Sequence, residues 1–531
     1  MERFKKAFKI TKNQIVSTVI ISLVMAVLYF VCIHFRDFNT ITGMYDSTVT
    51  AIKYLLKITV LAALLFLCIN AVRVFFAFRA ESISKRSGER HRVFFFAAWA
   101  CIVGAYMVWL IGTYPGSANL DTELQFKYFL GIEPWSMWHP PLSTFLMGSF
   151  YSFGMAFSNP NLGFFLYQFF QTLVAGAVFS YAMTKLLMLG ISRVYAIAGV
   201  LFYSLIPMFG AYAAWVEKDF LFATVFVLFI TMLTDVVIKK DISFWEMILL
   251  SIVSTVCSFL RNNGIYALFP ALFILIFVLK GKNRWRIFIC AAALICVYGC
   301  FTRIVFPKAG ISGTSISEVI GVTFQQTARY VNTYPDEVTE KQKEIIEKNF
   351  QSYDVMKNYD PVINDPVKIY YNNSDPKGYF KVWRQMLFKH PLTFLASYIN
   401  GSYGYLAPVK ADTGAYINSS YTGFLSEQLG LSMGEKPETR QIFIDLLNGS
   451  SYRFPTKYLN MPGLYTWFLL SMMLLVASGR KKRLIVLFIP SFVTLLVCTV
   501  SPLACAMRYA LPIVLATPLL IGLTMYSYRN D

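Results

Sequence analysis

The sequence predicts an all-α polytopic membrane protein with about twelve transmembrane helices, one re-entrant or interfacial helix, and an external domain of short helices and loops. Of its 531 residues, 56% are apolar and only 15% are charged, which is far outside the range of soluble globular chains. Apolar runs of about 17 to 25 residues recur along the chain, each long enough to cross a hydrocarbon core of about 30 Å. Their length, and the lack of two-residue alternation, favour helices over a barrel.

The predicted spans divide the chain into four parts. Two N-terminal spans lie in residues 1–92, a seven-span core occupies 93–306, and three C-terminal spans lie in 463–531. Between the core and the last three spans, residues 307–462 are polar and rich in turn residues, and they are long enough to form an external soluble domain. The twelve predicted spans are 15–35, 53–78, 93–112, 160–187, 194–212, 217–238, 245–260, 264–280, 286–306, 463–479, 483–500 and 504–526.

A thirteenth apolar stretch, residues 142–157, decides the topology. A full crossing there would place four clusters of lysine and arginine outside, whereas a tilted, re-entrant or interfacial helix places them in the cytoplasm, as the positive-inside rule requires. The clusters are Lys185 with Arg193, Lys239 with Lys240, Lys280 to Arg286, and Arg480 to Arg483. We therefore expect a multi-pass protein of the cell membrane with both termini in the cytoplasm and an uncleaved first anchor after the lysine-rich residues 1–12.

Charge and cysteine content argue against several protein classes. The formal net charge of +19 comes largely from the loops between apolar runs, which indicates topology and not nucleic-acid binding. All nine cysteines lie in or beside apolar segments without metal-ligand spacing, so we expect buried thiols and no disulfide framework. The sequence has no glycine-rich phosphate loop, serine-hydrolase signal or zinc pattern, so ATP-driven and serine-hydrolase chemistry has no support.

The predicted external loop 113–141 carries the strongest functional signal. Asp121 and Glu123 lie there between two apolar runs. A carboxylate at a membrane surface can act as a general base, or bind a divalent cation that neutralises a phosphate leaving group. It can also be a solvated loop charge. Aromatic residues around the pair, including Trp135 and Trp138, favour a shaped and partly dry site.

Two further polar segments reach the same external face in this topology. His139 precedes a pair of prolines, and it either starts a helix or contacts an anionic group or Asp121. The consecutive residues Glu217, Lys218 and Asp219 precede an apolar run. Acids there can cap a helix, but three charges in a row at a membrane boundary are costly unless they face a cavity.

Two arginines are also placed at the external face. Arg261 begins the turn Arg261-Asn-Asn-Gly264, which interrupts an apolar stretch and can be a simple hairpin turn. Arg508 has no acidic neighbour in sequence, so its partner must come from elsewhere in the fold. Because a guanidinium holds a phosphate through paired hydrogen bonds, both are candidates for binding an anionic substrate.

This pattern resembles the GT-C type of polyprenol-dependent glycosyltransferases, which includes protein O-mannosyltransferases and lipid A aminoarabinose transferases. The likeness covers most of residues 93–526 in layout, whereas specific short motifs match at three or four places. The acid signature departs from the family pattern, being Asp-Thr-Glu and not adjacent Asp-Glu, and no sugar-specific element is recognised. The matching features are the span 93–112 with Asp121 in the loop that follows, His139-Pro-Pro-Leu142, Glu217 and Asp219 before a later span, the large external segment after seven core spans, and Arg508-Tyr-Ala-Leu-Pro512.

The resemblance implies an inverting transfer of a sugar from a polyprenyl-phosphate donor to an envelope acceptor. Asp121 would deprotonate or orient the acceptor, while Arg261, Lys218 or Arg508 would stabilise the departing lipid phosphate. The expected partners are this lipid-linked sugar and membrane lipids, and no nucleic acid. No cofactor is certain, although Asp121, Glu123 and Asp219 are candidates for a divalent cation. The implied substrate-binding residues are Glu123, His139, Glu217, Lys218, Asp219, Arg261 and Arg508.

Two other functional classes compete with this interpretation. A transporter or flippase for an amphipathic or anionic envelope precursor would also have broken apolar segments and intramembrane charge. Against it, the polar residues gather on one face, and no repeat relates the two halves of the chain. A non-catalytic scaffold for envelope assembly would tolerate replacement of Asp121.

Overall fold

The computed structural model describes residues 11–82, 91–410, 416–433, 437–501 and 503–529, and the regular elements in this part of the chain are all helices. Outside the helices, backbone pairing among these residues is limited to isolated bridges. The lysine-rich segment before residue 11 and the last two residues, on which the predicted orientation of the termini partly depends, lie outside the described residues.

Eight helices of the described chain are long and apolar enough to cross a membrane, in agreement with the predicted polytopic helical class. A ninth candidate is the pair α8 (Arg193–Leu205) and α9 (Pro207–Ala213), bent by 61° at a proline that cannot continue the helical hydrogen bonding. Three shorter apolar helices are α11 (Phe244–Leu260), α12 (Gly264–Val278) and α24 (Pro462–Ser478). The eight long ones are α2 (Lys12–Phe38), α3 (Thr48–Ser82), α4 (His91–Gly112), α7 (Pro160–Met188), α10 (Lys218–Lys239), α13 (Gly281–Cys300) continued by η2 (Phe301–Val305) and α14 (Phe306–Lys308), η5 (Lys482–Phe488) with α25 (Ile489–Val500), and α26 (Met507–Ser527).

Helices α7, α10 and α26 form the centre of the bundle. Within the most apolar window of each helix, 78% is buried inside the protein for α10 and 83% for α26, whereas the corresponding value for α3 is only 6%. Composition alone does not decide which helix is central, because α3 is as apolar as α10 and yet lies at the edge. The two most enclosed helices are also the ones that begin at Lys218 and near Arg508.

Two short helices connect α4 to α7. Helix α5 (Leu120–Phe129) follows the end of α4, and α6 (Pro141–Met155) covers the stretch whose topology was uncertain from the sequence. With 15 residues, α6 is about 22 Å long, which is short of the hydrocarbon thickness. It packs closely along α7, where Gly154 and Gly163 allow the two backbones to approach.

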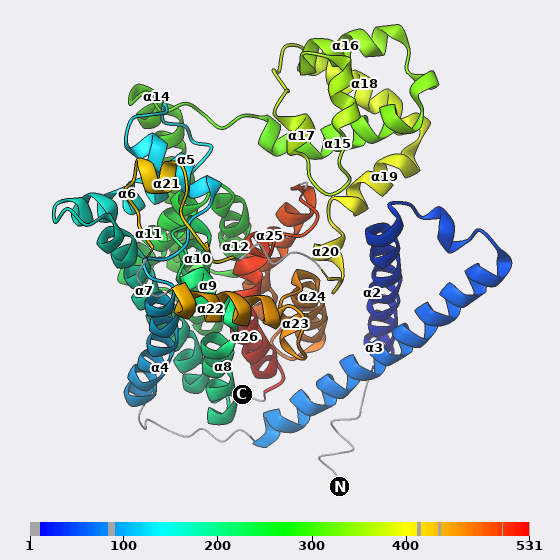
Figure 1. Cartoon of the computed structure of the whole chain (residues 1–531). Coiled ribbons are helices and arrows are strands. Elements are labelled where there is room, and N and C mark those ends of the chain that lie inside the picture. Colours follow the sequence, from blue (N-terminus) through cyan, green and yellow to red (C-terminus); the bar gives the residue numbers. More distant parts are fainter. Residues whose placement is uncertain (1–10, 83–90, 411–415, 434–436, 502, 530–531) are drawn as a thin grey trace.

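The predicted external segment 307–462 is not one body. Residues from 317 to 400 build a helical unit with its own core around Phe324, Phe350 and Tyr379, seen at the upper right of Figure 1. The remainder packs on the membrane helices, as Leu447 shows by joining the main hydrophobic core. The helices of the first part are α15 (Ser317–Thr333), η3 (Pro335–Glu337), α16 (Glu340–Phe350), η4 (Tyr353–Asn358), α17 (Asp365–Lys368), α18 (Pro376–Lys389) and α19 (Pro391–Asn400), and those of the second are α20 (Tyr403–Leu406), α21 (Phe424–Glu427), α22 (Pro437–Ser450) and α23 (Thr456–Leu459).

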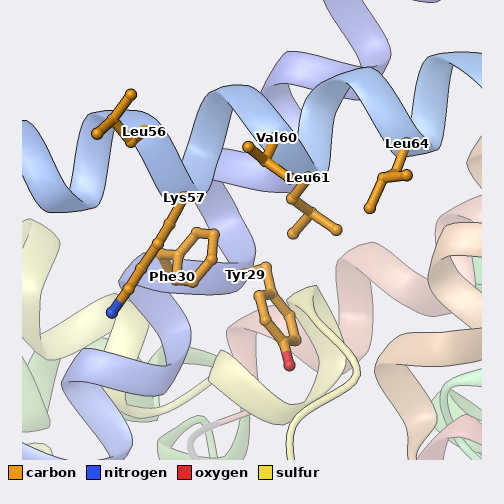
Figure 2. Close-up of a pocket in the computed structure, with 7 residues that line it drawn as sticks. All are labelled: Tyr29, Phe30, Leu56, Lys57, Val60, Leu61 and Leu64. Atoms are coloured by element: carbon orange, nitrogen blue, oxygen red, sulfur yellow. The ribbon is translucent and has the colours of Figure 1, made fainter.

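The N-terminal pair α2 and α3 lies at the edge of the bundle (Figure 1). Between the two helices is an open cavity of about 400 Å³ with apolar walls and the stem of Lys57, as Figure 2 shows. Neither helix carries a predicted site residue, and the cavity walls offer no carboxylate or imidazole for chemistry. The lining residues are Tyr29, Phe30, Leu56, Lys57, Val60, Leu61 and Leu64.

Replacing Gly163 by alanine is expected to destabilise the protein, because an added Cβ would lie 2.7 Å from the backbone oxygen of Phe150 and 2.7 Å from Cα of Tyr151. Backbone atoms cannot rotate away, so overpacking of about 1–3 kcal/mol should lower the midpoint of thermal unfolding in detergent by several degrees. Gly104→Ala is the matched control, since nothing lies within 4 Å of its added Cβ. Equal midpoints for the two variants would contradict close packing of α6 on α7.

Candidate functional site

Asp121 lies in the first turn of α5, on a backbone held against the segment before α10. Asn119 caps α5, and its side chain and that of Thr122 satisfy each other's backbone amides. The Thr122 hydroxyl also donates to the backbone oxygen of Val216 at 2.6 Å. Ser117 pairs with Trp215 in a parallel bridge. These bonds bring the loop that follows α4 beside the residues that precede α10, although nearly a hundred positions separate them.

The Asp121 carboxylate forms ion pairs with two cations from distant parts of the chain. Its Oδ2 lies 2.9 Å from a guanidinium nitrogen of Arg508 and 3.3 Å from Nζ of Lys218. Among the described residues, no hydrogen bond reaches Oδ1, and 31% of the side chain is exposed. Burial raises the pKa of Asp121, but the charges of Lys218 and Arg508 outweigh burial and hold this pKa well below its usual range. Asp121 is therefore an ionised, partnered carboxylate and not a solvated loop charge.

A second pair of acids lies behind Asp121. The Glu217 carboxylate accepts from the backbone amide of Asp219 at 2.6 Å and from Nζ of Lys218 at 2.9 Å, so it caps α10 and contacts the site lysine at once. Asp219, almost fully buried, forms an ion pair with Arg261. Burial, and then the charge of Asp219, raise the pKa of Glu217.

The two arginines share one aromatic ring. The guanidinium of Arg261 lies 4.6 Å from the ring centre of Tyr509, and that of Arg508 lies 4.9 Å from it. Arg508 also donates to the Tyr509 hydroxyl at 3.1 Å, and Arg261 donates to the backbone oxygen of Arg508 at 3.4 Å. Three acids and three bases therefore meet in one balanced group, which we call the charge cluster: Asp121, Glu217, Asp219, Lys218, Arg261 and Arg508.

His139 adds an uncharged side chain to the charge cluster. Its Nδ1 lies 3.4 Å from Nζ of Lys218, and the ring of Trp138 is parallel to the imidazole with centres 6.1 Å apart. Burial, and then the nearby ammonium of Lys218, lower the pKa of His139 to about 3. The imidazole is therefore neutral near pH 7 and accepts a hydrogen bond from the lysine, so it is not itself a cationic anion-binding group.

Of the two predicted site residues outside the six-membered charge cluster, His139 contacts it through Lys218, whereas Glu123 forms no ion pair with it among the described residues. No ion pair to its carboxylate occurs in the described part of the chain, and burial raises its pKa while Lys127 opposes this. The described residues likewise contain no group of three or more His, Cys, Asp or Glu side chains with metal-site geometry. The carboxylates of Asp121 and Asp219 are paired with lysine and arginine side chains. A divalent-cation site at these residues stays an untested prediction.

Sequence reasoning missed a clamp on the loop that leads to Asp121. Arg440, on α22, is almost fully buried and donates to the backbone oxygens of Thr113, Tyr114, Gly116 and Asn418. We call this set of contacts the Arg440 clamp. All four acceptors are backbone carbonyls, so nothing in the sequence marks this arginine.

A second covering segment, residues 416–433, was also missed. The hydroxyl of Tyr416 donates to the backbone oxygen of Ala118 at 2.8 Å, and that of Tyr421 donates to the oxygen of Gly116 at 2.7 Å. Both tyrosines thus bind the loop beside Asp121. The only sequence signal was the aromatic content of the segment, which does not name a target.

Comparison with protein-family models found a match to one family. The model of DUF6020, described as a family of unknown function, matches residues 136–531. The match includes His139, Lys218, Arg261 and Arg508, and it begins after Asp121. No curated protein and no solved structure was found to match the chain.

His139 is expected to stay neutral from pH 8 down to about pH 5, because its pKa lies near 3. Imidazole resonances of histidine-labelled protein in detergent can test this, with His139→Gln to assign one of the four histidines. In Lys218→Met, loss of the nearby ammonium should raise the pKa of His139 toward its usual value. Because the folded-state pKa is depressed, stability should fall as the pH drops from about 6.5 toward 3, and less so in His139→Gln. A wild-type midpoint between pH 6 and 7 would contradict the buried, lysine-bound imidazole.

Proposed function

The chain belongs to the DUF6020 family, and on that premise we propose that it is an inverting glycosyltransferase that moves a sugar from a polyprenyl-phosphate donor to an envelope acceptor. The observation that carries the proposal is the convergence of Asp121 with Lys218 and Arg508, which lie 97 and 387 positions away in sequence. Paired cations suit a phosphate, and a carboxylate with one unengaged oxygen suits an acceptor hydroxyl. Phosphate-binding and base-type groups thus occur side by side.

The proposal places the charge cluster at the external membrane face. Lys218 and Lys239 begin and end α10, and 22 residues of helix separate them by about 33 Å, close to one hydrocarbon thickness. At the far end, Lys239 and Lys185 both pair with Asp235, in the group of basic residues expected in the cytoplasm.

A topology of twelve crossings is part of the proposal. It requires the bent pair α8–α9 and the shorter helices α11, α12 and α24 to span, at about 22 to 26 Å each for the last three. Local thinning of the bilayer or flanking polar side chains can accommodate such lengths. Helix α6 then lies at the external interface without crossing.

The proposed reaction is a single displacement at the anomeric carbon of the donor sugar. The donor phosphate binds between Lys218 and Arg508, and the acceptor hydroxyl lies at Oδ1 of Asp121. As the acceptor oxygen bonds to the anomeric carbon, the bond from that carbon to the phosphate oxygen breaks. The hydroxyl proton passes to Asp121, and the lipid phosphate leaves with an additional negative charge that the two cations stabilise.

Binding of the donor and activation of Asp121 are linked in this scheme. A carboxylate held by two cations is a weak base, because its proton affinity is low. A phosphate that shares Lys218 and Arg508 adds an anion to a balanced cluster and weakens the hold of these cations on Asp121. The pKa of Asp121 then rises, so the base becomes effective only after the donor has bound.

A transporter or flippase for an anionic lipid precursor is the second candidate. The break between α8 and α9 favours it, because interrupted helices often line transport sites. It requires no acceptor and no bond breakage, so transport of a lipid-linked sugar in vesicles without any transferred product would support it over the glycosyltransferase.

Asp121→Asn is expected to abolish sugar transfer. The variant should nevertheless bind a short-chain polyprenyl phosphate more tightly, by about three- to tenfold, because the partly exposed Asp121 carboxylate, whose ion pairing contributes about 1 kcal/mol, no longer competes with the phosphate for Lys218 and Arg508. Arg508→Ala should weaken binding of the same probe at least as much. Arg508→Lys should recover only part of the loss because bidentate geometry is absent. Calorimetry in detergent measures the affinities, and a panel of polyprenyl-phosphate sugars with extracted envelope acceptors measures transfer.

Three results of these measurements are distinguishable. Unchanged probe affinity in Asp121→Asn, with weaker binding in Arg508→Ala, would remove the link between donor and base and keep the phosphate site. Wild-type transfer by Asp121→Asn would remove Asp121 from the mechanism. No binding of the probe to wild-type protein would overturn the donor class itself.

Cysteines at Lys239, Lys280 and Lys482 should resist a membrane-impermeant thiol reagent in intact cells and react after permeabilisation, in a variant without the nine native cysteines. All three side chains are exposed, unlike Lys185. A cysteine at Lys357, exposed on η4, is the positive control for the external face. Labelling at Lys239 in intact cells would overturn the proposed topology and with it the external site.

A further inference from the structure

Helix α22 lies across the end of a membrane helix. The ring of Phe443 is 5.0 Å from that of Trp109 and packs so closely on Gly112 that an added Cβ there would collide with it. Trp109 and Gly112 belong to the last turn of α4, and Figure 1 shows α22 in orange in front of that end. The depth of α22 is therefore that of the boundary between membrane and water at this end of α4.

The surface of α22 has three sectors. At about 100° per residue, one sector faces the bundle, a second is polar and a third is apolar but exposed. In the third, Ile442 is 64% exposed and Leu446 is 46% exposed. A helix with only a core face and a water face would not need the third sector. The bundle sector holds Arg440, Phe443, Ile444 and Leu447, and the polar sector holds Gln441, Asp445 and Asn448.

The membrane helix on which α22 packs also exposes apolar side chains near its end. On the last turns of α4, Val108 is 58% exposed and Ile111 is 65% exposed, as expected for a crossing helix at the edge of the bundle. The chain after α22 adds exposed aromatic residues, Tyr452 and Phe454, beside basic ones. Aromatic and basic side chains together are typical of the membrane interface.

We propose that Ile442 and Leu446 of α22, with Tyr452 and Phe454, dock on the lipid of the leaflet at this end of α4. We call these four residues the α22 lipid surface. In the topology proposed above, this is the external leaflet. A phospholipid surface, and not a protein groove, fits the narrow apolar sector, because the polar sector next to it must stay in water.

Lipid docking would also hold the Arg440 clamp in place. Arg440 projects from the bundle side of the same helix and binds the loop that leads to Asp121. Because α22 would lie at the interface and is hydrogen-bonded to this loop, the position of the loop would depend on the membrane. The inference concerns α22 and does not require sugar transfer.

Photo-cross-linking in lipid nanodiscs tests the proposal. A benzophenone amino acid is placed at 442 or 446, and for comparison at 441 or 445 on the polar sector of the same helix. Lipid adducts, detected as a mass increase of one phospholipid, should be several-fold more abundant at 442 and 446. All four positions are exposed, so thermal unfolding should stay near wild type and verify the fold. Equal adduct yields in the two sectors, or protein adducts at 442 and 446, would overturn lipid docking.

Amide exchange of residues 113–119 in nanodiscs tests the link to the Arg440 clamp. The double variant Ile442→Ser with Leu446→Ser should exchange several-fold faster there than the matched pair Gln441→Ser with Asp445→Ser. Equal exchange in both variants would show that lipid contact does not hold the loop.

Discussion

Three acids and three bases meet at α5, α10, α11 and α26, and because four of them, Glu217, Lys218, Asp219 and Arg261, are buried, only the balance of charge makes this arrangement stable. A buried charge without a partner costs several kcal/mol, far more than any one of these contacts contributes. Each member of the charge cluster therefore restricts the others: Asp219 needs Arg261, and Lys218 needs both Glu217 and Asp121. The positions of the helix ends follow from that requirement, and so does the sensitivity of the cluster to an added anion.

The backbone around the charge cluster is held as firmly as its side chains. The Arg440 clamp satisfies carbonyls of the loop after α4, and the Thr122 hydroxyl satisfies the carbonyl of Val216 in the segment before α10. Tyr416 and Tyr421 do the same from a segment more than two hundred and ninety positions further along the chain. A carboxylate that must meet two cations within hydrogen-bond distance needs such support, because rotation of one backbone bond would separate them.

The apolar runs predicted the helical class, and eight of the twelve predicted segments contain a helix long and apolar enough to cross a membrane. The remaining segments correspond to the bent pair α8–α9 and to the shorter helices α11, α12 and α24, and α12 is as short as α6, so helix length alone does not separate crossing from interfacial segments. The charge cluster was predicted in part. Its residues stood out because charge beside apolar sequence is costly, but their pairing depends on contacts between parts of the chain that no local pattern links. The Arg440 clamp could not be predicted from the sequence, because its acceptors are backbone carbonyls, which every residue type carries. The division of 307–462 into a separate helical unit and a part that packs on the membrane helices could not be predicted either. An amphipathic helix such as α22 has the sequence pattern of a soluble helix when the helices it packs on are unknown.

Ionic contacts at both ends of α10 also limit how the protein responds to bilayer thickness. At one end Lys218 is paired with Asp121 of α5, and at the other Asp235 is paired with Lys185 of α7. A vertical shift or a change of tilt would break contacts at one end, so the central helix cannot adapt to hydrophobic mismatch. The 32-residue candidate span of helix α3 lies at the edge, with only 6% of its most apolar window buried, and it is linked to α2 through Arg73 and Thr18 and not to the charge cluster. In the proposed topology, mismatch would be absorbed at the periphery, and the charge cluster would keep a constant height above the bilayer centre.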